Sequence, residues 1–182
     1  MKKIALDFDN VLSDTMIAWT KKYNEKYNKN LTKDDIRSWA FWKDFGIDHS
    51  QAMEIFNEAW TDWPNLPPTE DGLADTITGL AEYGTVDIVT EIDDSHLVGV
   101  KKWLDQNGIE INEIIHGEGK KISKPYDLFI DDSPSLAEQA MQYDKNCYIY
   151  DQKWNKHIEP SKNVLRIHSL TDAITKIADK GL

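Results

Sequence analysis

Short apolar strands alternate with helical stretches through the last two-thirds of this 182-residue chain. The strands are rich in β-branched residues, and the stretches between them repeat their apolar side chains at helical spacing. After a first strand at 3–8, further strands are expected at 85–90, 114–115, 127–130, 146–150 and 164–167, and helices at 71–83, 95–107 and 170–180. This alternation predicts an α/β fold with a doubly wound, Rossmann-like parallel sheet.

The stretch between the first strand and residue 70 reads differently, because it is helical and contains five of the tryptophans. Ser13 or Asp14 is the expected N-cap of one helix, Thr32 looks like the start of another, and a third is expected over 48–60. Prolines at 64, 67 and 68 then break regular structure. We therefore predict an α/β core, residues 1–13 and 70–182, and a small helical cap inserted after the first strand, residues 14–69.

Composition excludes several classes of protein. The net charge of −11 repels phosphate backbones, so a nucleic-acid polymer is not an expected partner. The single cysteine, Cys147, excludes an internal disulfide and a cysteine metal cluster. The chain has no apolar run near the roughly 20 residues that span a membrane, and its N-terminus lacks a signal-peptide pattern. A cytoplasmic location without a membrane partner is the expectation.

Pairs of aspartates follow two of the predicted buried strands. Asp7 and Asp9 follow the first strand, and Asp131 and Asp132 come directly after "LFI". If the two strands are neighbours, all four carboxylates converge at the carboxyl edge of the sheet. Such a cluster needs a cation, and ligands that are all oxygens suit Mg²⁺. The alternative is a turn after one strand and a helix cap after the other, but the repetition of the pattern favours a metal site.

These motifs resemble those of the haloacid dehalogenase superfamily of phosphotransferases. "LDFDNVL" resembles its first motif, Asp-x-Asp-x-Val/Thr, and "VDIVT", which ends at Thr90, resembles its second. "KISKPYDLFIDD" resembles the third and fourth, a lysine upstream of an aspartate pair. Within the superfamily, the sequence of the predicted core is similar to that of the 5′(3′)-deoxyribonucleotidases.

The resemblance implies a role for each matched residue. Asp7 would be the nucleophile that forms a phospho-aspartyl intermediate, and Asp9 the general acid and then the general base. Mg²⁺ would be held by Asp7, the backbone carbonyl of Asp9 and Asp131, with Asp132 in support. Thr90 would bind the phosphoryl group. The presence of Asp9 points to ester hydrolysis, because the dehalogenases of the superfamily lack this second aspartate.

The phosphate-binding lysine has three candidates. Lys121 is preferred, because it lies ten residues before Asp131, a spacing similar to that of the deoxyribonucleotidases. Lys120 is the second choice, and Lys124 is expected to face solvent. Glu91, directly after Thr90, departs from the small or apolar residue expected there.

The resemblance implies a Mg²⁺-dependent phosphomonoesterase, a 5′-nucleotidase acting on (deoxy)nucleoside monophosphates. Aromatic side chains of the cap suit stacking on a base, and the candidates are Trp19, Trp39, Trp42 and Phe45. Ordinary packing between cap and core is the alternative for each, and Trp60 is expected to belong to the core. Two other functions stay open: a phosphatase for a sugar phosphate or other small phosphomonoester, and a catalytically degenerate member that binds a protein partner. A homodimer is also left open.

Overall fold

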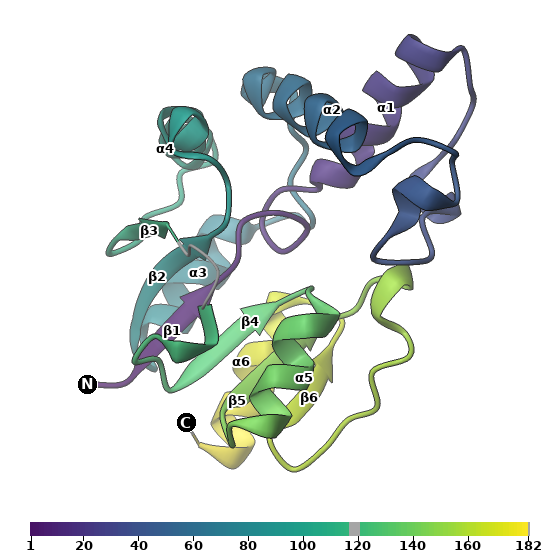
Figure 1. The fold of residues 1–182 in the computed structure, drawn as a ribbon. Coiled ribbons are helices and arrows are strands. Elements are labelled where there is room, and N and C mark those ends of the chain that lie inside the picture. The colour runs from purple at the N-terminus through teal and green to yellow at the C-terminus, as the bar shows by residue number, and fades with distance from the viewer. Residues whose placement is uncertain (117–120, 182) are drawn as a thin grey trace.

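The computed structural model describes residues 1–116 and 121–181, which form a parallel six-stranded sheet with helices on both faces (Figure 1). The strand order is β3-β2-β1-β4-β5-β6, and every pairing is parallel. The strands are β1 (Lys3–Leu6), β2 (Thr85–Thr90), β3 (Ile114–His116), β4 (Leu128–Asp131), β5 (Asn146–Tyr150) and β6 (Val164–Ile167). The predicted α/β class and doubly wound sheet are confirmed.

Two apolar layers hold the helices to the sheet. Along β1, Ile4 and Leu6 pack on one face and Ala5 on the other, as the two-residue period of a strand requires. The first face is covered by α3 (Leu73–Ala81), α4 (Leu97–Gln106) and α6 (Leu170–Lys180), and the second by α5 (Pro134–Gln142). Figure 1 shows α5 in front of the sheet and α3 and α6 behind it. Each buried Ile or Leu contributes about 1.5–3 kcal/mol to the free energy of folding.

Some ends of helices and strands agree with the sequence prediction, and others differ from it by a few residues. Ser133 caps α5 as expected, since its side chain accepts a hydrogen bond from the Leu136 amide and Pro134 occupies the first turn. The helix predicted over 95–107 begins with a 3₁₀ turn, Asp94–His96. Strand β1 ends at Leu6, two residues early, because the chain turns into a tight loop in which Leu12 and Ser13 both donate to the carbonyl of Phe8.

Residues 14–69, which we call the helical segment, lie between β1 and α3. Its elements are α1 (Thr15–Tyr27), η1 (Lys33–Asp35), η2 (Phe41–Lys43), α2 (His49–Thr61) and η3 (Trp63–Asn65). The two α-helices pack on each other through a cluster that includes Trp19 and Ile55. A helical turn does start after Thr32, which caps it together with Asp35. Only the single 3₁₀ turn η1 forms, however, because Ile36 adopts an extended backbone and buries its side chain.

The helical segment leaves the core and returns to it at one point. The Asp14 amide donates to the Pro67 carbonyl at 2.7 Å, and the Thr69 amide donates to the Leu12 carbonyl at 2.8 Å. Ser13 and Pro68 pair in antiparallel fashion between them. The two connections therefore form a short paired ribbon.

The N-terminus of α1 is capped from within the loop that follows β1. The side-chain oxygen of Asn10 accepts a hydrogen bond from the Met16 amide at 3.0 Å. Asp14 occupies the predicted N-cap position, but its side chain makes no hydrogen bond to the helix, so the side-chain cap comes from Asn10 instead. Asn10 reaches the helix because its backbone is left-handed, with φ of 58°. None of the helices among the described residues is long and apolar enough to cross a membrane.

Candidate active site

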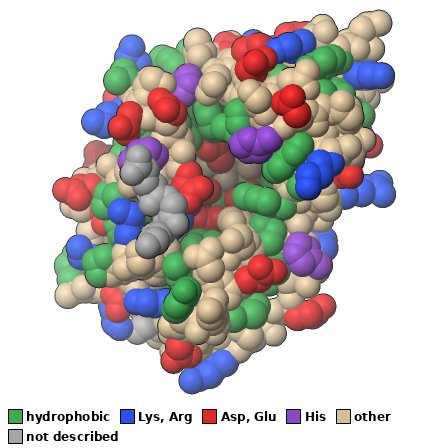
Figure 2. Space-filling model, in the orientation of Figure 1, with side chains coloured by type: hydrophobic (Ala, Val, Ile, Leu, Met, Phe, Trp, Pro, Cys, Tyr) green, Lys and Arg blue, Asp and Glu red, His purple; other side chains and the backbone are tan. Residues whose placement is uncertain are grey.

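A cavity of about 540 Å³ lies between the carboxyl ends of β1, β2 and β4 and the helical segment. Figure 2 shows the hollow, with acidic side chains inside it and hydrophobic side chains beside it. The strand order reverses between β1 and β4, and such a switch point is where open α/β sheets bind ligands. The topology therefore places the cavity where the sequence expected the site.

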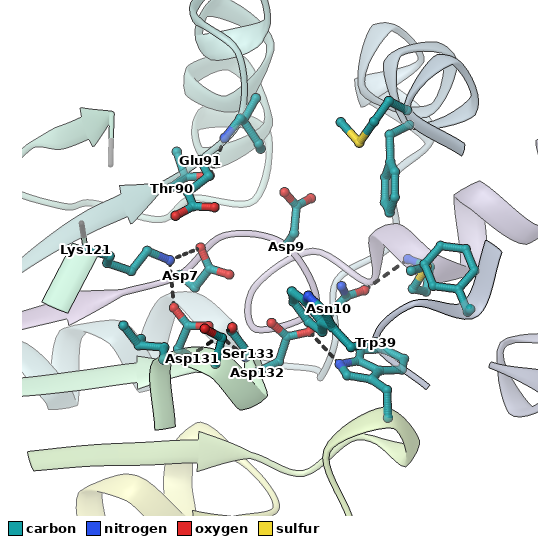
Figure 3. Close-up of a pocket in the computed structure, with 18 of the residues that line it drawn as sticks. Asp7, Asp9, Asn10, Trp39, Thr90, Glu91, Lys121, Asp131, Asp132 and Ser133 are labelled. Carbon is teal, nitrogen blue, oxygen red and sulfur yellow. Dashed lines mark hydrogen bonds and ion pairs between the residues drawn. The ribbon is translucent and has the colours of Figure 1, made fainter. Parts of the chain in front are cut away.

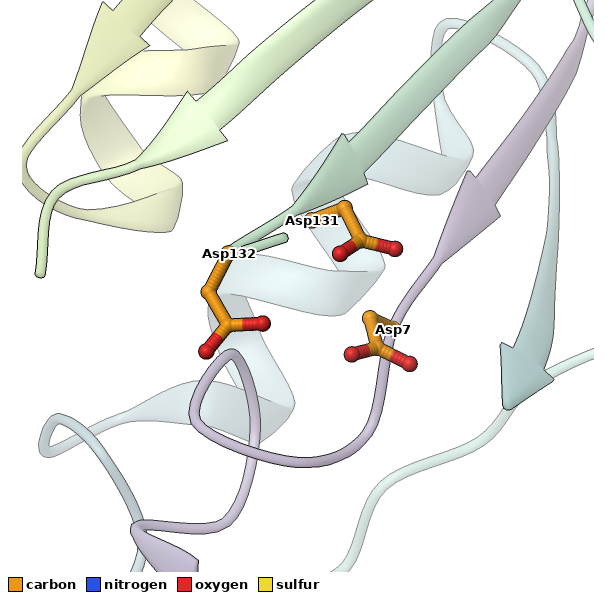
Figure 4. Close-up of side chains that lie close together, drawn as sticks. All are labelled: Asp7, Asp131 and Asp132. Carbon is orange, nitrogen blue, oxygen red and sulfur yellow. The ribbon is translucent and has the colours of Figure 1, made fainter. Parts of the chain in front are cut away.

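Three carboxylates form the floor of this cavity. Asp7, Asp131 and Asp132 each offer an oxygen, and these oxygens lie within 4.8 Å of one another (Figure 4). Asp131 is held by the amide of Ser133, which donates to its Oδ1 at 2.8 Å, and Asp132 by the indole of Trp154, which donates to its Oδ2 at 3.1 Å. Both aspartates are 2% exposed, so the protein fixes their geometry before any ligand binds.

Lys121 lies between two of these carboxylates (Figure 3). Its Nζ is 2.8 Å from Oδ1 of Asp7 and 2.6 Å from Oδ2 of Asp131. Burial disfavours its charge, but Asp131 and Asp7 outweigh burial and raise the pKa of Lys121, which stays protonated. Lys120 lies outside the described residues, and Lys124 is partly exposed and does not line the cavity.

One lysine does not balance the negative charge of the floor. Burial, together with the charges of Asp131 and Asp9, raises the pKa of Asp7 to about 8 against the opposing effect of Lys121. Burial and the charge of Asp131 likewise raise the pKa of Asp132 well above its usual value. A second cation would relieve this, and a set of oxygen donors this close together fits a small, hard divalent ion such as Mg²⁺.

Asp9 stands apart from the other three aspartates (Figure 3). Its Oδ1 accepts hydrogen bonds from the hydroxyl of Thr15 and from the indole of Trp60, the latter at 2.9 Å. Burial raises the pKa of Asp9, and these two hydrogen bonds oppose the rise. The predicted convergence of four carboxylates thus divides into a cluster of three and one separate carboxylate that faces the helical segment.

Thr90 ends β2 at the cavity, 1% exposed, with its hydroxyl accepting a hydrogen bond from the Ile92 amide at 3.2 Å. The exposed side chain of Glu91 follows it on the cavity wall. The residue that departs from the expected pattern therefore borders the same space as Thr90.

Two of the four predicted base-stacking residues line the cavity. Trp39, which is 47% exposed, and Trp42 both do. Trp19 does not, because it is fully buried, stacks on Tyr23 and donates its indole N–H to the Ala52 carbonyl. Phe45 packs beside Trp19 and also lies outside the cavity lining. A base-stacking role for Trp19 and Phe45 does not fit this structure.

Several other residues that line the cavity were not predicted from the sequence. Trp60 is mostly buried, as expected, but it also borders the cavity and contacts Asp9. Nothing in the sequence ties an indole on α2 to an aspartate 51 residues earlier. The remaining aromatic and polar lining residues that were missed include Phe41, Phe56, Trp154, Ser135 and Gln139.

Comparison with known proteins agrees with this site. Residues 1–180 match the family described as 5′ nucleotidase, deoxy (pyrimidine), cytosolic type C. The chain belongs to this nucleotidase family. It is accordingly a phosphoric monoester hydrolase, and the resemblance drawn from the sequence motifs is confirmed. No curated protein matches the sequence.

Solved structures share the fold at low sequence identity. The haloacid dehalogenase-like family protein SP0104 from Streptococcus pneumoniae has a TM-score of 0.68 at 13% identity, covering 97% of this chain and 98% of its own. The haloacid dehalogenase-like protein ATU0790 from Agrobacterium tumefaciens has a TM-score of 0.67 at 11% identity, with 100% of each chain covered. YfnB from Bacillus subtilis, a structure bound to magnesium, has a TM-score of 0.62 at 14% identity and covers 97% of this chain and 98% of its own.

Proposed function

We propose that this member of the nucleotidase family is a Mg²⁺-dependent 5′-nucleotidase that hydrolyses (deoxy)nucleoside monophosphates through a phospho-aspartyl intermediate. The observation that carries the proposal is the cluster of Asp7, Asp131 and Asp132, which is paired with Lys121. Opposite this cluster lie the aromatic side chains with which the helical segment lines the cavity, and we call them the aromatic wall: Trp39, Phe41, Trp42, Phe56 and Trp60. The substrate class is a small phosphomonoester rather than a nucleic-acid polymer, in keeping with the net charge of −11.

Asp7, Asp131 and the backbone carbonyl of Asp9 would hold the metal, with Asp132 in support. When bound, Mg²⁺ supplies the positive charge that lets an anionic nucleophile approach an anionic phosphate. The structurally similar YfnB is bound to magnesium, which supports the choice of ion. Lys121 neutralises part of the floor, and together with Thr90 it would contact the phosphoryl oxygens.

The reaction then has two halves. A carboxylate oxygen of Asp7 attacks phosphorus, the bond from phosphorus to the ester oxygen breaks, and Asp9 gives its proton to the departing oxygen. In the second half Asp9 takes a proton from water, whose oxygen attacks the phosphorus of the phospho-aspartate, releasing inorganic phosphate and restoring Asp7. Asp9 suits both halves because its separate position lets it meet the leaving group.

The division into a core of residues 1–13 and 70–182 and a cap of residues 14–69 is part of the proposal. The helical segment provides the aromatic wall, in which Trp39 and Trp42 are the proposed stacking partners of the base. Stacking of a base on an aromatic side chain contributes about 1–3 kcal/mol. A sugar phosphate is the second candidate, supported by the polar side chains of Ser135 and Gln139 on α5.

The test is phosphate release with Mg²⁺ from ribo- and deoxynucleoside monophosphates, sugar phosphates and p-nitrophenyl phosphate. We expect the nucleotides to have the highest kcat/KM, and the wild-type activity to disappear with a chelator. Preferential hydrolysis of sugar phosphates would replace the substrate while keeping the chemistry. If none of these esters is hydrolysed, the degenerate, partner-binding alternative gains support.

A further inference from the structure

Two hydrogen bonds fix the side chain of Asp9, and both come from the helical segment. Thr15 opens α1 and donates its hydroxyl to Oδ1 of Asp9. Trp60, near the end of α2, donates its indole N–H to the same oxygen at 2.9 Å. Among the described residues, no side chain or amide of the α/β core donates to this carboxyl group. The orientation of Asp9 therefore depends on where the helical segment sits.

Trp60 is itself fixed by its neighbours, so it can hold the side chain of Asp9 in one orientation. Its side chain is 8% exposed, and its ring stacks on Phe56 of the same helix with centroids 5.4 Å apart. Its ring also contacts His96 in the turn before α4, with centroids 5.5 Å apart. The indole thus bridges α2 and the core, and its N–H points to Asp9.

The choice of oxygen has a chemical consequence. A neutral carboxyl group has one oxygen that accepts hydrogen bonds and one that carries the proton. Because two donors reach Oδ1, the acidic proton belongs on Oδ2. Asp9 lines the cavity, where the leaving group would bind. Fixing this arrangement before the reaction keeps the proton aimed at the leaving group.

We propose that Trp60 is a positioning residue that orients Asp9 for proton transfer, and that it makes this orientation conditional on contact between α2 and the core. The inference rests on the proposed phosphomonoesterase function and adds a residue to it. Trp60 would act through Asp9 and would not touch the reacting atoms.

The test compares two substrates whose leaving groups differ in how much they need a proton from Asp9. A nucleoside leaves as a strongly basic alkoxide that requires protonation, whereas p-nitrophenolate is a weak base that departs without it. The kcat/KM value is the right measure, because it covers the steps up to leaving-group departure and omits attack by water. Trp60→Phe keeps an aromatic ring next to Phe56 and His96 but removes the N–H donor.

We expect Trp60→Phe to lower kcat/KM at least about tenfold for a nucleoside monophosphate and less than about threefold for p-nitrophenyl phosphate. Both values come from one preparation, so a partly unfolded sample lowers both equally and leaves their ratio unchanged. Trp63→Phe is the matched control, since Trp63 lies outside the cavity lining and packs near Gly99. It should leave both values at the wild-type level.

Equal losses for the two esters, or no loss for either, would overturn the role of Trp60. A wild-type protein that cleaves a different alkyl phosphate but not nucleotides would overturn the proposed substrate, and the same ratio measured on that ester would still decide the role of Trp60. A wild-type protein that hydrolyses no phosphomonoester would remove the proposed function, and this inference with it.

Discussion

The floor and the aromatic wall of the cavity are held in place by different forces. The floor consists of carboxylates at strand ends, each fixed by a directed bond to a lysine, an amide or an indole. The wall consists of aromatic rings on the helical segment, such as Trp42, which is held by edge contacts with Phe41 and His49. Directed bonds specify a geometry, whereas ring contacts tolerate substitution. The difference suggests that the floor sets the chemistry and the wall sets the choice of substrate.

The sharpest test of the floor is Asp7→Asn. If Asp7 is the nucleophile, the amide cannot form the acyl phosphate, and kcat should fall by about 10⁴-fold or more. Phosphate release with Mg²⁺ measures this. Asp127→Asn is the control, because Asp127 precedes β4 at the opposite end of the sheet and pairs with Lys2. A variant at position 7 that keeps a tenth of the activity would contradict the assignment.

Removal of the lysine should affect both activity and stability. Lys121→Met leaves Asp7 and Asp131 buried without their shared partner, which costs about 3–5 kcal/mol of folding free energy. We expect kcat/KM to fall by about 10²-fold or more, since phosphate loses a positive contact. Thermal unfolding without and with Mg²⁺ measures the loss of stability, and the metal should restore part of it. Lys124→Met serves as the control, and an unchanged Tm at position 121 would argue against the pairing.

A pair of tryptophan variants distinguishes the role of the aromatic wall in substrate binding from the role of buried residues in the stability of the helical segment. Trp42→Ala should raise KM for nucleoside monophosphates about tenfold, in line with 1–3 kcal/mol of lost stacking, with a small change in Tm. Trp19→Ala should instead lower the free energy of unfolding by about 3–5 kcal/mol, because Trp19 is fully buried. Its KM at a temperature where the protein is folded should stay near the wild-type value. The opposite assignment of the two effects would show that the wall has been misidentified.

The smallest expected effect concerns pH and the metal-free protein. The folded-state pKa of Asp7 is raised to about 8, so the folded protein keeps a proton that the unfolded chain loses near pH 4. Stability therefore decreases as pH rises from about 4 to 8. Asp7→Asn removes this dependence, so its Tm should exceed that of the wild type by a few degrees at pH 8 and by less at pH 5. A constant difference across this range would rule out the raised pKa.

The sequence predicted the floor better than the wall for a physical reason. The alternation of strands and helices places Asp7 and Asp131 at strand ends, and the parallel sheet brings those ends together. This inference needs local patterns and the condition that the two strands are neighbours, which the pairing of β1 with β4 meets. The choice of Lys121 came from the resemblance, because its spacing to Asp131 is similar to that of the deoxyribonucleotidases, and the structure places it between the two carboxylates.

The wall could not be predicted in the same way. Trp19 and Trp42 are the same residue type in the same segment, yet one fills the interior and the other faces the cavity. The periodicity of α1 places Trp19 on the apolar face of the helix, but it does not show whether that face packs against other helices or lines the cavity. The contact of Trp60 with Asp9 depends on the docking of α2 on the core, which is a tertiary relationship that a helical pattern does not contain.

The paired connections at Leu12–Asp14 and Pro67–Thr69 have a consequence for how such an enzyme can change over time. Because the segment between them begins and ends at one place, its exchange for another of different length need not shift any strand of the sheet. Replacement of this one insertion would keep the carboxylate floor and Lys121, but the new segment would have to supply its own hydrogen-bond donors to Asp9, because Thr15 and Trp60 both lie in the present one.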